Sequence, residues 1–134
     1  MTPHPGEMAR LLATTSAAIQ HHRLGAARTF CDNHAATLVL KGAGTIVAEG
    51  RRTAFNTSGN PGMASPGMGD VLTGIAAAFA ARVKDPYTAA CLAVHVHGLA
   101  ADVRAQLSHG PGYLASEVAD SVPGALALLG ASVQ

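Results

Sequence analysis

The sequence contains 134 residues, of which 49% are hydrophobic and 13% are charged, and its formal net charge at pH 7 is +1. This composition suits one domain with one core and excludes intrinsic disorder of the whole chain. The charge balance excludes the positive field of a nucleic-acid-binding protein, and no stretch approaches the roughly 20 apolar residues that span a bilayer. Without a secretory signal, and with Cys31 and Cys91 isolated in the sequence, the chain is expected to be cytoplasmic, with no nucleic-acid or membrane partner.

The first part of the chain predicts two helical segments. Two prolines make residues 1–6 extended or turning, because proline fixes its own φ and disfavours helix in the residue before it. Good helix formers follow at residues 7–12. A second helical pattern covers residues 17–35, although Gly25 weakens its middle.

The pattern then changes to short, β-branched apolar runs, which predict strands at residues 37–40, 45–48 and 51–55. Glycines between the first two runs, in residues 41–44, indicate a tight turn. Residues 56–69 have no hydrophobic period and are rich in Gly, Pro, Asn and Ser, so they are predicted to form a loop. A structureless loop of this length in a compact domain is usually functional.

Alanine-rich helical patterns follow at residues 70–83, 86–107 and 116–129, with a break at residues 109–112. The order is therefore helices, short strands, a glycine loop and more helices. This order favours a layered α/β domain.

The strongest candidate for chemistry is the point where the glycine loop enters the next helix, at Gly67-Met68-Gly69-Asp70. A helix N-terminus has unpaired N–H groups and partial positive charge, and glycines let a phosphate approach those groups closely. An Asp beside a phosphate site can act as general base toward an attacking hydroxyl. The alternative is that Asp70 only caps the helix. The long loop before it favours the functional interpretation.

A second candidate is Lys41-Gly42-Ala43-Gly44-Thr45, which follows a predicted strand. Its backbone could wrap the ribose or phosphates of a nucleotide while Lys41 supplies positive charge. The segment lacks the residue order of a Walker A motif. A glycine hairpin turn beside a lysine that lies along the surface explains the spacing equally well.

The seven histidines raise the possibility of a metal site, but their spacing does not support one. His95 and His97 are two residues apart on a predicted helix and so point to different faces. No Cys or carboxylate cluster completes a site, so no protein-bound metal is expected. His4, between two prolines, is either a fixed hydrogen-bonding group in a pocket or an exposed loop histidine.

Several motifs in combination resemble one family. They are Thr2-Pro3-His4-Pro5-Gly6-Glu7, Lys41-Gly42-Ala43-Gly44-Thr45, Asn60-Pro61-Gly62-Met63-Ala64 and Gly67-Met68-Gly69-Asp70-Val71-Leu72-Thr73-Gly74. Together and in this order they resemble the NAD(P)H-hydrate dehydratases, which are ADP- or ATP-dependent repair enzymes of the ribokinase-like superfamily. The resemblance continues through residues 97–102 and 112–116, so it covers essentially the whole chain.

The resemblance implies a three-layer ribokinase-like α/β fold and the conversion of hydrated NADH or NADPH (NADHX or NADPHX) back to the coenzyme. It implies that Asp70 is the catalytic base and that Asp70 and His4 contact the hydrated nicotinamide. ADP or ATP would act as co-substrate, and Mg²⁺ is the expected ion. The implied nucleotide-binding residues are Lys41, Gly42, Ala43, Gly44, Thr45 and Gly69, with Asn60, Gly62 and Gly67 in the supporting loop.

The chain begins where the family pattern is about halfway through its domain. We therefore expect residues 1–134 to form a single, incomplete ribokinase-like domain, its C-terminal portion, with short strands followed by several helices. A homo-oligomer or a missing N-terminal half would then complete the pocket. Two other functions stay open: a ribokinase-like kinase for a sugar or vitamin, with Asp70 as base, and a non-catalytic fragment that only binds nucleotide or oligomerises.

Overall fold

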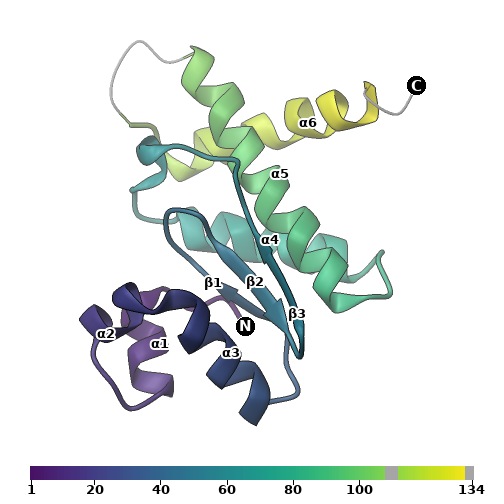
Figure 1. The fold of residues 1–134 in the computed structure, drawn as a ribbon. Helices are drawn as coiled ribbons and strands as arrows, with labels where there is room; N and C mark the ends of the chain where they lie inside the picture. Colours follow the sequence, from purple (N-terminus) through teal and green to yellow (C-terminus); the bar gives the residue numbers. More distant parts are fainter. Residues whose placement is uncertain (108–111, 132–134) are drawn as a thin grey trace.

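The computed structural model describes residues 1–107 and 112–131, in which helices surround a small sheet (Figure 1). The elements in chain order are α1 (Pro5–Leu11), α2 (Ser16–His21), α3 (Arg23–Asn33), β1 (Leu38–Leu40), β2 (Ile46–Glu49), β3 (Arg52–Phe55), the short 3-10 helix η1 (Pro61–Met63), α4 (Met68–Ala80), α5 (Pro86–Leu107) and α6 (Ala115–Ala131). No helix within the described ranges combines the length and apolar character needed to cross a bilayer.

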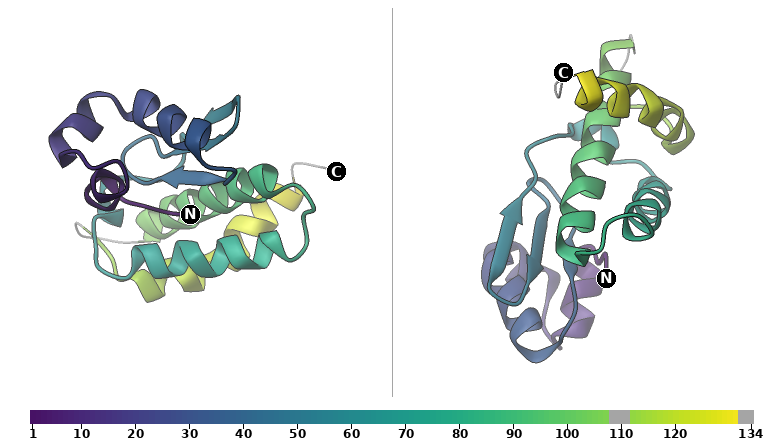
Figure 2. Two further views of the ribbon diagram at one scale, coloured as in Figure 1. Left: turned by 90° about the horizontal axis from the view of Figure 1, so that it is seen from below. Right: turned by 90° about the vertical axis from the view of Figure 1, so that its right-hand side faces the viewer.

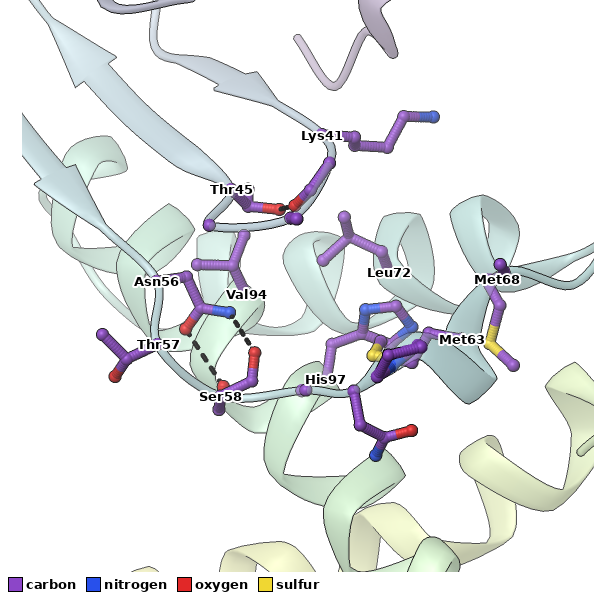
Figure 3. Close-up of a pocket in the computed structure, with 18 of the residues that line it drawn as sticks. Lys41, Thr45, Asn56, Thr57, Ser58, Met63, Met68, Leu72, Val94 and His97 are labelled. Atoms are coloured by element: carbon purple, nitrogen blue, oxygen red, sulfur yellow. Dashed lines mark hydrogen bonds between the residues drawn. The ribbon is translucent and has the colours of Figure 1, made fainter. Parts of the chain in front are cut away.

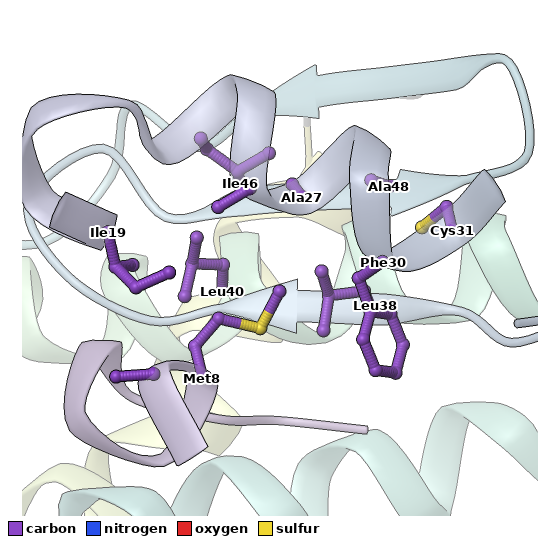
Figure 4. Packing of buried hydrophobic residues seen from close by; sticks show 11 residues of the cluster. Met8, Ile19, Ala27, Phe30, Cys31, Leu38, Leu40, Ile46 and Ala48 are labelled. Carbon is purple, nitrogen blue, oxygen red and sulfur yellow. The ribbon is translucent and has the colours of Figure 1, made fainter. Parts of the chain in front are cut away.

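The sheet is antiparallel with strand order β1-β2-β3, and helices cover both of its faces (Figure 2). Successive side chains of a strand point to opposite faces, and both faces here are apolar. One face contributes Leu38, Leu40, Ile46 and Ala48 to a core with α1, α2 and α3 (Figure 4). The other face contributes Val39 and Val47 to a core with α4 and α5. The three-layer arrangement expected from the resemblance is confirmed.

A third apolar cluster extends the molecule beyond the sheet. It joins α5 and α6 to the start of α4 through Met68, Ala100, Ala101, Tyr113, Val118 and Ala125. At one end α5 packs against the sheet, and at its other end it packs against α6. Helix α5 is therefore buried along much of its length. This helix therefore provides the rigid wall against which the glycine-rich loop lies.

The N-terminal residues lie beside the first strand. The backbone N–H of Val39 donates to the Met1 carbonyl at 2.8 Å, and that of Lys41 donates to the Pro3 carbonyl at 2.9 Å. The Met1 amino group donates to the Thr37 carbonyl at 2.7 Å. Residues 1–3 are thus extended, as expected from the prolines, and their pairing brings the start of α1 close to Lys41.

Two boundaries predicted from the sequence are wrong. The helical pattern at residues 17–35 forms two helices, α2 and α3, separated at His22, whose φ of −134° and ψ of 49° are not helical. This turn lets Ile19 and Phe30 enter the same core, whereas Gly25 lies inside α3. Asp70 does not begin its helix, because α4 starts at Met68.

The remaining boundaries agree with the sequence to within two residues, except that α4 ends at Ala80 instead of residue 83 and that the short helix η1 lies inside the predicted loop. The strands are joined by the tight turns expected, and α5 spans residues 86–107 as predicted. Of the break expected at residues 109–112, residues 109–111 lie outside the described part of the chain.

Candidate functional site

The turn between β1 and β2 needs glycine at two positions. Gly42 has a φ of +139° and Gly44 a φ of +61°, values that side-chain-bearing residues rarely adopt. The Thr45 hydroxyl donates to the Gly42 carbonyl at 3.0 Å and closes the turn. The segment is therefore a hairpin turn, as the structural interpretation predicted, and it also lines a cavity.

Arg23 of α3 holds this turn from the side of the first core. Its guanidinium donates to the carbonyls of Leu40 at 3.1 Å, Lys41 at 3.3 Å and Ala43. Partial burial of Arg23 lowers its pKa, but the group stays charged at neutral pH. Because one planar cation binds the carbonyls of two turn residues and of the last residue of β1, the backbone of the turn has a fixed conformation.

Lys41 links the start of α1 to the start of α4. Its Nζ lies 3.8 Å from Oε2 of Glu7. The same Nζ also lies close to Gly69, since a Cβ added to this glycine would be 3.2 Å from it. The imidazole of His4 caps α1, since its Nδ1 accepts from the N–H of Gly6 at 3.0 Å and of Glu7 at 3.2 Å. The His4 ring is thus a fixed group beside Lys41, and its side chain is 54% exposed.

Asp70 lies in the first turn of α4. The N-cap of this helix is Gly67, in a left-handed conformation with a φ of +85°, and no side chain caps it. The alternative that Asp70 is only an N-cap is therefore wrong. The Asp70 side chain is exposed, and within the described residues its carboxylate has no hydrogen-bond or ion-pair partner.

The loop after β3 packs directly on α5. Ser58 donates through its hydroxyl to the His95 carbonyl at 2.9 Å. A Cβ on Gly98 would lie 2.3 Å from that hydroxyl oxygen and 2.6 Å from the Ser58 carbonyl carbon, so the loop and helix approach as closely as glycine allows. This contact sets the position of residues 56–60.

Asp102, one turn further along α5, anchors the next part of the loop. Its carboxylate accepts from the N–H of Gly59 and from the amide of Asn60, both at 2.8 Å. The Asn60 side-chain oxygen in turn accepts from the Gly62 N–H at 3.1 Å and from the Tyr113 hydroxyl. The Asn60-Pro61-Gly62 motif is therefore held by an interlocked set of hydrogen bonds.

These elements enclose a cavity of about 810 Å³ with a mostly apolar wall (Figure 3). The glycine turn forms one side, the loop after β3 another, and the first turns of α4 and the middle of α5 form the floor. A cavity of this size is typical of small-ligand sites. The side chains labelled in Figure 3 are Lys41, Thr45, Asn56, Thr57, Ser58, Met63, Met68, Leu72, Val94 and His97.

The structure brings most of the predicted site residues to this cavity. Those that line it are Lys41, Gly42, Ala43, Gly44, Thr45, Asn60 and Gly69. Gly62 and Gly67 belong to the loop and helix start that support it, while Asp70 and His4 stand outside the lining. Sequence patterns assign no role to Arg23 or Asp102, and they raise His97 individually only as a metal ligand, although residues 97–102 belong to the resemblance. No local motif identifies the first two, because their partners are distant in the sequence.

Comparison with known proteins decides the family. Residues 1–124 match the family model described as NAD(P)H-hydrate dehydratase. The chain belongs to this family. It is 45% identical over 124 residues to a bifunctional NAD(P)H-hydrate repair enzyme of Moorella thermoacetica, and 44% identical over 121 residues to an ADP-dependent (S)-NAD(P)H-hydrate dehydratase of Neisseria meningitidis. These matches cover 92% and 89% of this chain but 23% and 41% of the relatives.

Solved structures agree with the family assignment. An ADP/ATP-dependent NAD(P)H-hydrate dehydratase from Bacillus subtilis, co-crystallised with ATP and Mg²⁺, superposes with a TM-score of 0.89 at 30% identity and matches 95% of this chain. A ribokinase-like superfamily protein from Enterococcus faecalis superposes with a TM-score of 0.79 at 30% identity. The fold is thus ribokinase-like, and the chain spans 46% of the Bacillus chain and 42% of the Enterococcus chain.

Proposed function

We propose that this chain carries the nucleotide-binding cavity and the catalytic base of an NAD(P)H-hydrate dehydratase. The proposed reaction uses ADP or ATP to convert hydrated NADH or NADPH back to the coenzyme. The observation that supports it best is the geometry around α4. An apolar cavity of about 810 Å³ ends at the first turn of this helix, where the Asp70 carboxylate is exposed and has no partner in the described residues.

The proposed chemistry begins with phosphorylation of the substrate hydroxyl. Asp70 accepts the hydroxyl proton as the oxygen attacks the terminal phosphoryl group, and the bond from that group to the rest of the nucleotide breaks. The phosphate ester on the nicotinamide ring is a better leaving group than hydroxide. The lone pair of the ring nitrogen then expels phosphate, and loss of a proton from the neighbouring carbon restores the double bond.

We propose that the nucleotide lies against the glycine turn. The Lys41 ammonium and the N–H groups of the turn and of Gly69 suit an anionic ligand, because they combine positive charge with unhindered backbone donors. His4, fixed as a cap of α1, is proposed to contact the hydrated nicotinamide on the other side of Lys41. This arrangement would place the phosphoryl donor and the acceptor hydroxyl on either side of Asp70.

We propose that Mg²⁺ accompanies the nucleotide. Among residues 1–107 and 112–131, no group of three or more His, Cys, Asp or Glu could hold a metal ion by itself. A Mg²⁺ ion takes few protein ligands and several phosphate oxygens, so the residues present fit an ion held mainly by the nucleotide, near Asp70. When bound, Mg²⁺ would neutralise charge on the transferred phosphoryl group.

We also propose that the protein is cytosolic and homo-oligomeric. Cys31 and Cys91 are both free thiols, as in a reducing compartment. Large apolar side chains are exposed at the end of α5 and around α6, at Leu107, Leu114 and Leu126, and such a surface favours a protein contact. Light scattering would test this, since a monomer at every concentration would contradict the oligomer.

The activity is tested with the purified chain, hydrated NADH, Mg²⁺, and either ADP or ATP. We expect recovery of NADH absorbance together with release of phosphate, and loss of both in Asp70→Asn. Asp120→Asn, which changes an exposed carboxylate of α6 in the same way, serves as the matched control.

Each other outcome has a definite meaning. A phosphorylated product that persists would contradict the dehydratase and favour a small-molecule kinase. Nucleotide binding without turnover of any substrate would leave only the nucleotide-binding function. Absence of nucleotide binding would contradict every form of the proposal.

A further inference from the structure

The loop of residues 60–67, which leads into α4, meets the chain near the start of α6 at both of its ends. A Cβ added to Gly62 would lie 2.7 Å from Cε1 and 2.9 Å from Cζ of Tyr113. A Cβ added to Gly67, at the other end, would lie 3.1 Å from Cβ of Ala115. In Figure 1 the teal loop that contains η1 accordingly lies beside the first turn of α6. Residues far along the chain therefore set the position of this loop.

Tyr113 also hydrogen-bonds the loop through its hydroxyl, which donates to Oδ1 of Asn60. The same oxygen accepts from the Gly62 N–H at 3.1 Å, and Nδ2 of Asn60 donates to the Asp102 carboxylate at 2.8 Å. Since a carboxylate only accepts, the Asn60 amide nitrogen must face Asp102 and the amide oxygen must face Tyr113. Tyr113 is therefore the donor, and the amide has one orientation.

The surroundings of Tyr113 keep that donor in place. The residue is 9% exposed and belongs to the apolar cluster that also contains Met68, the first residue of α4. Burial raises the pKa of the Tyr113 phenol, so the hydroxyl keeps its proton at neutral pH. A phenylalanine would fill the same cluster equally well. The hydroxyl itself therefore calls for a role beyond packing.

We propose that Tyr113 is a positioning residue for phosphoryl transfer. Its hydroxyl, acting through Asn60, holds the loop so that the first turn of α4 presents the Gly69 N–H and the Asp70 carboxylate to the reacting groups. Tyr113 is not among the described residues that line the cavity, so it acts without touching the ligand. The proposal rests on the function proposed above for Gly69 and Asp70. A small displacement of a catalytic group is enough to lower the rate, because transfer depends on close alignment.

The first test is steady-state kinetics with hydrated NADH, ADP and Mg²⁺. Tyr113→Phe keeps the ring and removes the donor, so kcat should fall about 3- to 10-fold, as for the loss of one hydrogen bond. The KM for ADP should stay the same, because the glycine turn that is proposed to bind the nucleotide does not contact Tyr113. A purely structural role would instead lower the urea midpoint and leave the kcat of the folded protein unchanged.

Tyr87→Phe is the matched control, since Tyr87 is the second of the two tyrosines in the chain. Its ring lies under the Arg52 guanidinium, 4.5 Å from ring centroid to Cζ, near the start of α5 and outside the cavity lining. This substitution should change neither kcat nor KM.

The second test needs no activity and uses the backbone amide spectrum of the ligand-free chain. Tyr113→Phe should shift the amide resonances of Gly62 and also those of Gly67, Gly69 and Asp70, whereas Tyr87→Phe should shift none of them. Shifts confined to Asn60 and Gly62, or an unchanged kcat in Tyr113→Phe, would overturn the positioning role. If the unsubstituted chain has no turnover, the proposed function fails, while shifts at Gly69 and Asp70 would still support the control of α4 by Tyr113.

Discussion

Replacement of Gly98 by alanine tests the way the cavity wall is built. The added Cβ would lie 2.3 Å from the Ser58 hydroxyl oxygen, 2.6 Å from the Ser58 carbonyl carbon and 2.7 Å from its carbonyl oxygen. Two of these atoms are backbone, so a rotamer change cannot relieve the contact. The loop must move away from α5 by about 1 Å, because non-bonded carbon contacts need about 3.5 Å or more.

The expected loss combines several terms. Overpacking of this kind costs about 1–3 kcal/mol. Displacement of the loop also weakens the hydrogen bond from Ser58 to the His95 carbonyl and those from Gly59 and Asn60 to Asp102, each worth about 1 kcal/mol. Alanine gains about 1 kcal/mol over glycine as a helix former. The net loss in free energy of unfolding is therefore about 2 kcal/mol, a fall in Tm of about 6–12 °C for a chain of this size.

Gly74→Ala is the control, because Gly74 lies inside α4 and a Cβ there meets nothing within 4 Å. It should gain up to about 1 kcal/mol from helix propensity alone. Urea unfolding followed by far-UV circular dichroism measures both, which suits a chain without tryptophan. If Gly98→Ala is as stable as the unsubstituted chain, the close packing of the loop on α5 is refuted.

Four further results are expected. Asp70→Asn should lower turnover by at least about 100-fold while the Kd for ADP measured by calorimetry stays nearly the same; turnover near that of the unsubstituted chain would contradict the role of base. Arg23→Met removes the cation that binds the carbonyls of Leu40, Lys41 and Ala43, so the free energy of unfolding should fall by about 2 kcal/mol and the Kd for ADP should rise; unchanged values would show that the turn does not depend on Arg23. Asp102→Asn, with its carboxylate replaced by an amide, should lose about 1–2 kcal/mol in urea unfolding, and an equally stable variant would rule out Asp102 as the loop anchor. Burial lowers the pKa of His97 to about 4, so the unfolded chain binds one more proton at His97 than the folded chain between about pH 6.5 and pH 4. The free energy of unfolding should therefore fall by up to about 3 kcal/mol as the pH decreases through this window; a urea titration series in which His97→Leu shows the same fall would exclude His97 as the cause.

Much of the fold follows from local patterns. The β-branched runs on either side of residues 41–44 predict the strands β1 and β2. The glycines between them predict the tight turn, because its positive φ angles favour glycine. The start of α4 differs from the predicted start at Asp70, and the reason is also local. Asp is a strong N-cap residue, yet here Gly67 in a left-handed conformation begins the helix and leaves Asp70 in the first turn with its carboxylate exposed.

The break between α2 and α3 has no such signal. Gly25 is the residue in this stretch that weakens a helix, but the chain turns at His22 so that Ile19 and Phe30 both reach the core beneath β1 and β2. Packing of distant residues therefore decides the boundary. Local propensity is overridden here by tertiary contacts.

The supporting residues of the site were beyond prediction because their partners are far away along the chain. Arg23 is 17 residues from Leu40, and Asp102 is 43 residues from Gly59. The spacing of His97 predicted only that it would not bind metal with His95. Its burial against the glycine-turn cavity depends on how α5 crosses the sheet and the loop.

The most direct test of the central claim is an NMR titration of the chain with ADP and Mg²⁺, followed through the backbone amides. The cavity between the glycine turn and α4 should bind ADP saturably, with the largest shifts at Gly42, Gly44, Thr45 and Gly69 and small shifts in α2 and α3. Absence of saturable binding, or shifts centred on the α2–α3 side of the sheet, would contradict the assignment of this cavity as the adenine-nucleotide site.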